Sequence, residues 1–224
     1  MSGGLRVPDR CRRPFCPGGL FHLSKERLVL YRFYSHTLKK PVITLIAGEY
    51  FATQNGEVLH TIVGSCIATC IYDEKIKVAG MNHFLLPGMI RPDEILSSEV
   101  ARYGMFAMEL LIGELIKLGA RRKGLRAKVF GGGNVLRFRR DDGDITESNV
   151  RFSKKFLELE GIPAVKVDVG GSAGRKIFFF TDTHRVLLKR FDMRQDKRSF
   201  QDEDFYKRRI FQRRLAKSRV VLFQ

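Results

Sequence analysis

The stretch VGSCIATCIYDEKIKVAGMNHFLLP, residues 63–87, holds two apolar runs separated by one short polar break. Glu-Lys is poor chemistry for a two-residue turn, so we expect a four-residue loop centred between Glu74 and Lys75. That centre would place Cys66 directly opposite His83. Side chains that face each other across antiparallel strands share one face, with Cβ atoms about 4.5–5.5 Å apart. The stretch therefore predicts a hairpin that carries a thiol beside an imidazole.

Cys66 has the chemistry of a nucleophile if a neighbour takes its proton. A free cysteine has a pKa of about 8.5 and is only a few per cent thiolate at neutral pH, so His83 is the candidate base. Gly64 and Ser65 directly before the thiol would let the backbone turn tightly, with the N–H groups of Ser65 or Cys66 facing a developing oxyanion. A Cys-His pair with such a hole is suited to acyl transfer from an amide or ester.

Packing is the alternative interpretation of the same two residues. A lone cysteine is often a small buried hydrophobe, and a histidine in an apolar strand is often a core side chain with satisfied hydrogen bonds. Cys70 lies about 13 Å from Cys66 along an extended strand, too far for a disulfide, and is expected in the core. Spacing alone leaves catalysis and packing both open.

Two helices are expected after the hairpin. The first follows Ser97 and Ser98, which are cap candidates, and stops at Gly119. The second fits residues 148–160 and is ended by Gly161. The predicted buried stripe of the first helix consists of Val100, Tyr103, Ala107, Leu111, Leu115 and Leu118.

Strands outnumber helices and do not alternate with them regularly. Outside the hairpin, short β-branched or aromatic runs lie within residues 41–53, 125–136, 162–169, 175–182 and 185–191. The predicted fold class is α+β, with mixed, largely antiparallel, sandwich-like β-sheets flanked by helices in a single domain.

The positive charge of the chain lies at its two ends. The 41 Lys and Arg against 24 Asp and Glu give a formal net charge of +17, of which +7 falls in residues 1–40 and +8 in residues 185–224. The 224 residues suffice for one sizeable domain. We therefore expect a basic, poorly ordered N-terminal arm at 1–40, one body at 41–191 and a basic tail at 192–224 that is a candidate for an appended helix.

The four cysteines favour a reducing compartment over a disulfide framework. The sequence has no secretory signal pattern and no apolar run of about 18 residues, which predicts a cytoplasmic protein with no membrane span. Cys11 and Cys16 could be pictured with His22 as part of a zinc site, but the spacing is off the usual pattern and a second Cys pair is missing. We expect no metal.

Two glycine clusters, FGGGN at 130–134 and VGGSAG at 169–174, each invite a phosphate-loop interpretation. Neither has the Lys-Ser/Thr or the strand-turn-helix context of the nucleotide motifs, so turns or close backbone approach near the active site are preferred. A buried Arg175 beside Asp168 would be structural, whereas an exposed one could contact substrate.

Eight co-linear motifs carry a resemblance to a known family. They are AGEY at 47–50, GSCIATCIYD at 64–73, GMNHFLLP at 80–87, RYGMFAMELLIGELIKLGA at 102–120, AKVFGGGNVL at 127–136, ESNV at 147–150, DVGG at 168–171 and GRKIFFF at 174–180. Over about residues 44–190 this chain closely resembles the chemoreceptor glutamine deamidase family, CheD.

The resemblance implies hydrolysis of selected receptor glutamine carboxamides to glutamates, with release of ammonia, in bacterial chemotaxis. It implies that Cys66 is the nucleophile and His83 the general base, with methyl-accepting chemotaxis receptors as the protein substrate. It also implies docking with the CheC phosphatase. The same chemistry would cleave a glutamyl methyl ester, and it requires no metal or organic cofactor.

The sequence departs from the family pattern at the third site residue. The family has a Thr six residues before the Cys, where this chain has His60, and Thr61 follows at once. Three outcomes stay open: Thr61 takes the role through a small register shift, His60 orients the base, or activity is reduced.

A binding protein is the competing function from another class. In this alternative a catalytically weak or inactive deamidase-like body acts as a regulatory module on receptors or on a CheC-type phosphatase. Nucleic acid is disfavoured as a partner, because the nearly neutral body has no nucleic-acid motif and a basic tail is more commonly just solvated.

Overall fold

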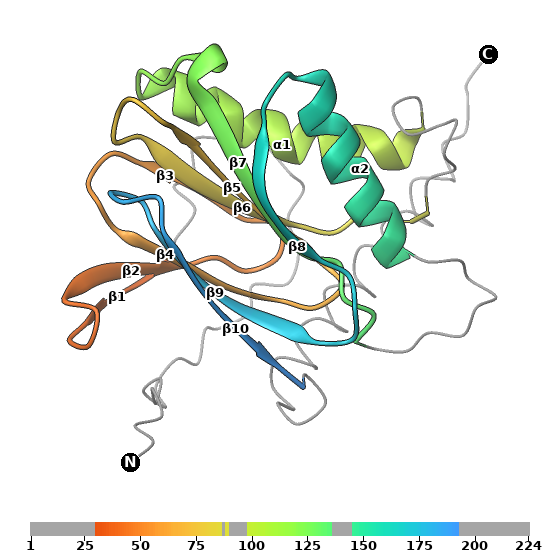
Figure 1. The fold of residues 1–224 in the computed structure, drawn as a ribbon, viewed down its shortest axis with the longest axis horizontal. Helices are drawn as coiled ribbons and strands as arrows, with labels where there is room; N and C mark the ends of the chain where they lie inside the picture. Colours follow the sequence, from red (N-terminus) through yellow and green to blue (C-terminus); the bar gives the residue numbers. More distant parts are fainter. Residues whose placement is uncertain (1–29, 87, 90–97, 136–144, 193–224) are drawn as a thin grey trace, which may run out of the picture.

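The computed structural model describes residues 30–86, 88–89, 98–135 and 145–192, whose strands form two five-stranded sheets (Figure 1). In spatial order, the first sheet consists of β1 (Tyr31–Ser35), β2 (Lys40–Thr44), β4 (Val58–Val63), β9 (Gly174–Phe180) and β10 (Val186–Phe191). The second sheet consists of β3 (Tyr50–Thr53), β6 (Ala79–Phe84), β5 (Ile67–Asp73), β7 (Leu125–Gly131) and β8 (Ala164–Val169). Among these strands only β2–β4 and β7–β8 pair in parallel, so the predicted mixed, largely antiparallel α+β fold is confirmed.

The molecule has three layers, because helices α1 (Glu99–Lys117) and α2 (Ile145–Leu159) both pack on the second sheet (Figure 1). One apolar core lies between the two sheets and brings Leu59 and Phe179 of the first sheet together with Met81 of the second. The other core lies between the second sheet and the helices. Burial of one large aliphatic or aromatic side chain contributes about 1.5–3 kcal/mol, so these two cores fix the sheets and helices relative to each other.

Strand β5 is buried on both faces, which explains its near-continuous apolar sequence. Ile67 and Ile71 face the helices, whereas Ala68 and Cys70 face the first sheet. Cys70 is a free, fully buried cysteine, as expected, and burial raises the pKa of its thiol.

The register of the β5–β6 hairpin differs from the predicted one by two residues. Ala68, not Cys66, lies directly opposite His83. The prediction of a direct Cys66–His83 pair was therefore wrong. A shift by two keeps every side chain on its face of the sheet, because the side-chain period of a strand is two. Cys66 is thus the diagonal neighbour of His83 on the face toward the first sheet.

Asp73 accounts for the register error. The sequence placed it in the loop, but it is the last residue of β5, is fully buried and pairs with Leu125 of β7. Its carboxylate accepts the backbone N–H groups of Arg121 and Lys75, both at 2.9 Å. These bonds and the nearby Arg121 charge hold the pKa of Asp73 below its ordinary value, against the opposing effect of burial. A polar residue with such partners can extend a buried strand.

Helix α1 begins and ends as predicted, since the Ser98 hydroxyl accepts Ala101 N–H at 3.1 Å and Gly119 has φ 97°. The predicted stripe was wrong at Tyr103, which is 37% exposed. Gly104 lies one position further along and packs against the helix α2 side chain Phe152 so closely that a Cβ there would lie 2.5 Å from the ring. The close packing of the two helices therefore turns Tyr103 outward.

The body extends N-terminally beyond residue 41, because β1 lies within the predicted arm and pairs with β2. Residues 1–29, which include the Cys11, Cys16 and His22 group, and residues 193–224, which include most of the predicted tail, lie outside the described residues.

Candidate active site

The turn at residues 64–66 is held by the glycines of the FGGGN motif. Gly133 N–H donates to Gly64 O at 2.7 Å, and Gly132 N–H donates to Cys66 O at 2.8 Å. Gly131 has φ 114°, and a Cβ on it would lie 2.0 Å from Cys66 O. Only glycine permits this approach. These glycines allow the backbone to pass close to the candidate nucleophile. This is the interpretation that the sequence favoured over a phosphate loop.

Cys66 and His83 both belong to the space between the sheets. Cys66 directly precedes β5 and is 1% exposed, within the core between the sheets. His83 lies in β6 and is 6% exposed. Its backbone is hydrogen-bonded to the segment that leads into β3. His83 N–H donates to Glu49 O at 2.9 Å, and Gly48 N–H donates to His83 O at 2.7 Å.

Thr61 reaches His83 from the first sheet. Its Oγ1 lies 2.8 Å from His83 Nδ1 and 2.8 Å from the carbonyl oxygen of Leu45. A threonine hydroxyl has one hydrogen, and a carbonyl can only accept, so Thr61 donates to Leu45 O. His83 Nδ1 must then carry a hydrogen and donate to Thr61 Oγ1. This arrangement assigns the lone pair of the imidazole to Nε2.

The electrostatics of His83 suit a neutral base. Burial lowers the pKa of His83 to about 4, and the Leu45 carbonyl opposes this lowering. The ring is therefore neutral at pH 7. Its Nε2 atom is buried and has no hydrogen-bond partner among the described residues. An uncharged imidazole with a buried nitrogen that has no hydrogen-bond partner among the described residues can accept a proton from a neighbouring acid.

His60 lies on the opposite face of β4, because neighbouring residues of a strand point to opposite sides. Its Nδ1 lies 3.2 Å from Thr44 Oγ1, and its ring packs on Phe178 with centroids 4.5 Å apart. Burial, with a smaller contribution from Lys176, lowers the pKa of His60 to about 3. Of the two residues that the sequence left open for the third position, the one that hydrogen-bonds His83 is Thr61.

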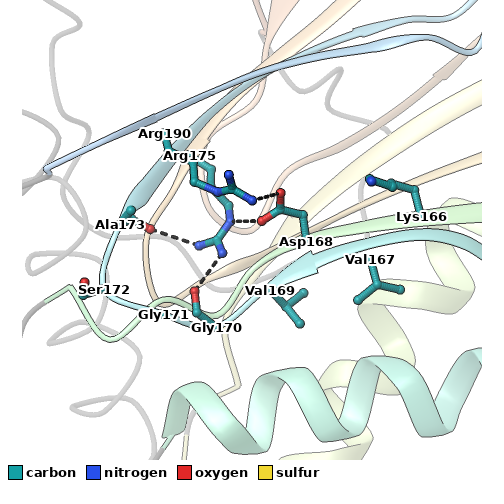
Figure 2. A pocket seen from close by; sticks show the side chains of 10 residues that line it. All are labelled: Lys166, Val167, Asp168, Val169, Gly170, Gly171, Ser172, Ala173, Arg175 and Arg190. Atoms are coloured by element: carbon teal, nitrogen blue, oxygen red, sulfur yellow. Dashed lines mark hydrogen bonds and ion pairs between the residues drawn. The ribbon is translucent and has the colours of Figure 1, made fainter.

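A cavity of about 470 Å³ lies beside the second glycine turn, along edge strand β8 (Figure 2). Its lining consists of residues 166–173, Arg175 and Arg190. Neither Cys66 nor His83 is part of this lining.

Arg175 in this cavity is a structural residue. It is 3% exposed, and its guanidinium donates to Asp168 Oδ1 at 3.0 Å, to Ala173 O at 3.0 Å and to Gly170 O at 2.7 Å (Figure 2). All three bonds fix the turn after β8. A Cβ on Gly133 would lie 2.8 Å from Ala173 O. The turn after β8 therefore packs against the glycine loop that holds Cys66.

The described residues meet neither the requirements of a metal site nor those of a membrane-spanning helix. There, no three His, Cys, Asp or Glu side chains come together in a group that could hold a metal ion. Neither of the two described α-helices is long and apolar enough to cross a membrane.

The fold and site define an α+β protein of two stacked sheets, in which Thr61 hydrogen-bonds His83 and Cys66 lies diagonal to His83 on the same face of the second sheet. The family model for "CheD chemotactic sensory transduction" matches residues 85–190, a segment that begins just after His83. The "Probable chemoreceptor glutamine deamidase CheD 1" of Shewanella oneidensis is 41% identical over 179 residues, covering 80% of this chain and 86% of the relative.

Two further relatives carry the likeness across the body. The "Probable chemoreceptor glutamine deamidase CheD" of Laribacter hongkongensis is 41% identical, with 80% of this chain and 86% of the relative covered. Its counterpart in Methylobacillus flagellatus is 38% identical, with 89% and 98% covered. This chain belongs to the CheD family.

A solved structure shows only a weak likeness. The crystal structure of Bacillus licheniformis hypothetical protein YfiH covers 54% of this chain and 49% of that chain, with 14% identity and a TM-score of 0.34. A match at this level carries no argument about fold or function.

Proposed function

We propose that this protein hydrolyses glutamine side chains of methyl-accepting chemotaxis receptors to glutamates, with release of ammonia, in the cytoplasm of a chemotactic bacterium. The proposal rests on the names of the relatives and on one observation of the site. Thr61 accepts the Nδ1 hydrogen of His83, which leaves Nε2 as the basic nitrogen. A neutral imidazole held in this tautomer is what a general base for a thiol requires.

The reaction begins with the Cys66 proton passing to His83 Nε2. The thiolate sulfur then forms a bond to the carbonyl carbon of the glutamine side chain, and the carbonyl oxygen takes up negative charge. When the C–N bond breaks, imidazolium His83 returns the proton to the nitrogen, which leaves as ammonia. A γ-glutamyl thioester remains on Cys66.

Water completes the reaction. His83 takes a proton from water, and the hydroxide oxygen bonds to the thioester carbon. The C–S bond then breaks to give the glutamate side chain, and imidazolium His83 returns its proton to the Cys66 sulfur. The net change is one amide and one water converted to one carboxylic acid and one ammonia. A glutamyl methyl ester would react in the same way and release methanol.

The N–H groups of Ser65 or Cys66, in the turn that Gly64 and Ser65 form, are the proposed hydrogen-bond donors to the oxyanion. Gly133 N–H donates to the Gly64 carbonyl, and Asn149 Nδ2 lies 3.4 Å from the Ser65 carbonyl. These contacts fix the peptide planes that contain Ser65 N–H and Cys66 N–H. N–H groups held in fixed peptide planes need no reorganisation when charge develops on the substrate oxygen.

The departure from the family pattern at His60 left open that activity is reduced. The hydrogen bond between Thr61 and His83 supports the active enzyme over the regulatory module. A CheC-type phosphatase remains a proposed further partner.

Ammonia release from a purified receptor signalling domain tests the proposal. The native protein is compared with Cys66→Ala and with Cys70→Ala, which removes a second buried cysteine from the same face of β5. Release that disappears only in Cys66→Ala supports the deamidase. Undiminished release from Cys66→Ala, or no release from native protein that binds the receptor, contradicts it.

A further inference from the structure

Asn149 is a fully buried amide near the start of α2, and its side chain contacts three backbone segments. Its Oδ1 accepts Leu86 N–H at 2.8 Å. Its Nδ2 donates to Ile145 O in its own helix at 2.9 Å and lies 3.4 Å from Ser65 O. One side chain thus joins the helix layer to two segments of the second sheet's hairpin.

Each of these two segments adjoins one of the proposed reacting residues. Ser65 directly precedes Cys66, and Leu86 follows His83 by three residues. With the bonds from Gly132 and Gly133, the carbonyls of residues 64, 65 and 66 each have a partner. Two of these partners are glycine N–H groups, and the third is the Asn149 amide. Asn149 is therefore the side chain that holds the middle carbonyl of this turn.

A buried polar side chain in a helix stripe needs a reason, because burial without partners is costly. Ser153, one turn further along α2, has a purely local reason, since its hydroxyl donates to Asn149 O at 2.7 Å. Asn149 differs, because two of its three partners lie 84 and 63 positions away in the sequence.

We propose that Asn149 is a positioning residue for the reaction of Cys66 with the substrate amide. The inference rests on the proposed function. Asn149 contacts Ser65 O and Leu86 N–H with the two ends of one amide group. It therefore fixes the position of the turn that carries Cys66 relative to the segment that follows His83. Attack on a carbonyl depends steeply on such placement, and an error of about 1 Å can cost about 100-fold in rate.

Three variants separate positioning from simple stability. Asn149→Ala removes all three contacts. Asn149→Asp keeps an acceptor for Leu86 N–H but cannot donate to Ser65 O. Ser153→Ala is the matched control, because it removes a fully buried hydroxyl of the same helix whose bond is local.

Two measurements are made on each variant, both corrected for the folded fraction from circular dichroism. The first is kcat and KM for ammonia release from a receptor signalling domain. The second is the rate at which iodoacetamide alkylates Cys66 between pH 6 and pH 9, followed by peptide mass spectrometry, which needs no receptor and no turnover.

The expected result is a fall in kcat of about 10- to 100-fold for Asn149→Ala, with KM within about twofold. Asn149→Asp is expected to lose most of the same rate, and Ser153→Ala to stay within about twofold. The pH dependence of Cys66 alkylation is expected to change in both Asn149 variants and to remain native in Ser153→Ala.

Native kcat per folded molecule together with a native alkylation profile in Asn149→Ala would overturn the proposal and leave Asn149 a purely structural residue. If that variant does not fold, the same outcome in Asn149→Asp overturns it. If the native protein releases no ammonia, the proposed function fails, and alkylation alone still decides whether Asn149 controls Cys66.

Discussion

Thr61 of the first sheet and His83 of the second share a hydrogen bond of 2.8 Å across the space between the two sheets. The bond fixes the imidazole tautomer only because Thr61 has already donated its hydrogen to Leu45 O. The packing of the two sheets therefore sets the chemistry of the candidate base.

Thr61→Val is expected to lower kcat for ammonia release by about 10- to 100-fold, because the ring loses the acceptor that holds Nδ1–H. Thr69→Val is the matched control, since Thr69 is fully buried and its hydroxyl has no hydrogen-bond partner among the described residues. Steady-state rates of the two variants check this. Equal losses in both would refute a specific role for Thr61.

His60→Thr is expected to leave the rate within about threefold of native, because His60 lies on the far face of β4 and packs on Phe178. The measurement is ammonia release under the same conditions as for native protein. A tenfold gain would show that the family-like Thr at this position improves the site, and that the assignment to Thr61 is wrong.

These two positions show what the sequence could and could not predict. Residue type and the quoted motifs predicted Cys66 and His83 as the site residues, which stays a prediction, and the order of apolar runs predicted the mixed fold class, which the structure confirms. The choice between Thr61 and His60 could not be made, because it depends on which face of β4 meets the other sheet. That face is set by pairing of β4 with β2 and β9, which are distant in sequence.

The register of the hairpin was missed for a related reason. A polar residue such as Asp73 is typical of a turn, and its backbone partner Arg121 lies 48 positions away. Asn149 carried a usable signal, since a buried amide at helical spacing with Phe152 and Ser153 needs partners. Its partners themselves could be known only from the structure.

The free energy of unfolding is expected to rise as the pH increases from about 4 to about 6.5. The cause is His83, whose pKa is about 4 in the folded protein and ordinarily 6.5. In this window the unfolded chain binds more protons than the folded chain, so folding is favoured as pH increases and this stability is lost as pH falls. The full contribution is on the order of 3 kcal/mol.

Urea unfolding of the native protein and His83→Gln at several pH values from 4 to 7 measures this contribution as the difference between the two curves. The comparison with His83→Gln is needed because His60 also has a lowered pKa, of about 3, and adds to the native slope. Parallel curves for the two proteins would rule out a buried, neutral His83.

Gly131→Ala is expected to lose more than 2 kcal/mol of unfolding free energy, roughly the sum of a left-handed backbone strain and a steric clash. The Cβ would lie 2.0 Å from Cys66 O, so ammonia release per folded molecule should also fall below a tenth of native. Thermal unfolding and steady-state rates check both effects.

Gly113→Ala in helix α1 is the matched control for that substitution, because nothing lies within 4 Å of the added Cβ. Alanine is favoured over glycine in a helix by about 1 kcal/mol, so this variant should be as stable as native or more so. A Gly131→Ala protein as stable and active as Gly113→Ala would contradict the close approach of the glycine loop to Cys66.

The proposed reaction passes through a γ-glutamyl thioester on Cys66, which hydroxylamine can trap. The receptor domain and the enzyme react in the presence of hydroxylamine, and receptor peptides are analysed by mass spectrometry for glutamyl hydroxamate. Hydroxamate is expected at the deamidated glutamines with native protein, and none is expected with Cys66→Ala. Ammonia release from native protein without any hydroxamate, or equal hydroxamate with Cys66→Ala, would contradict the proposed reaction.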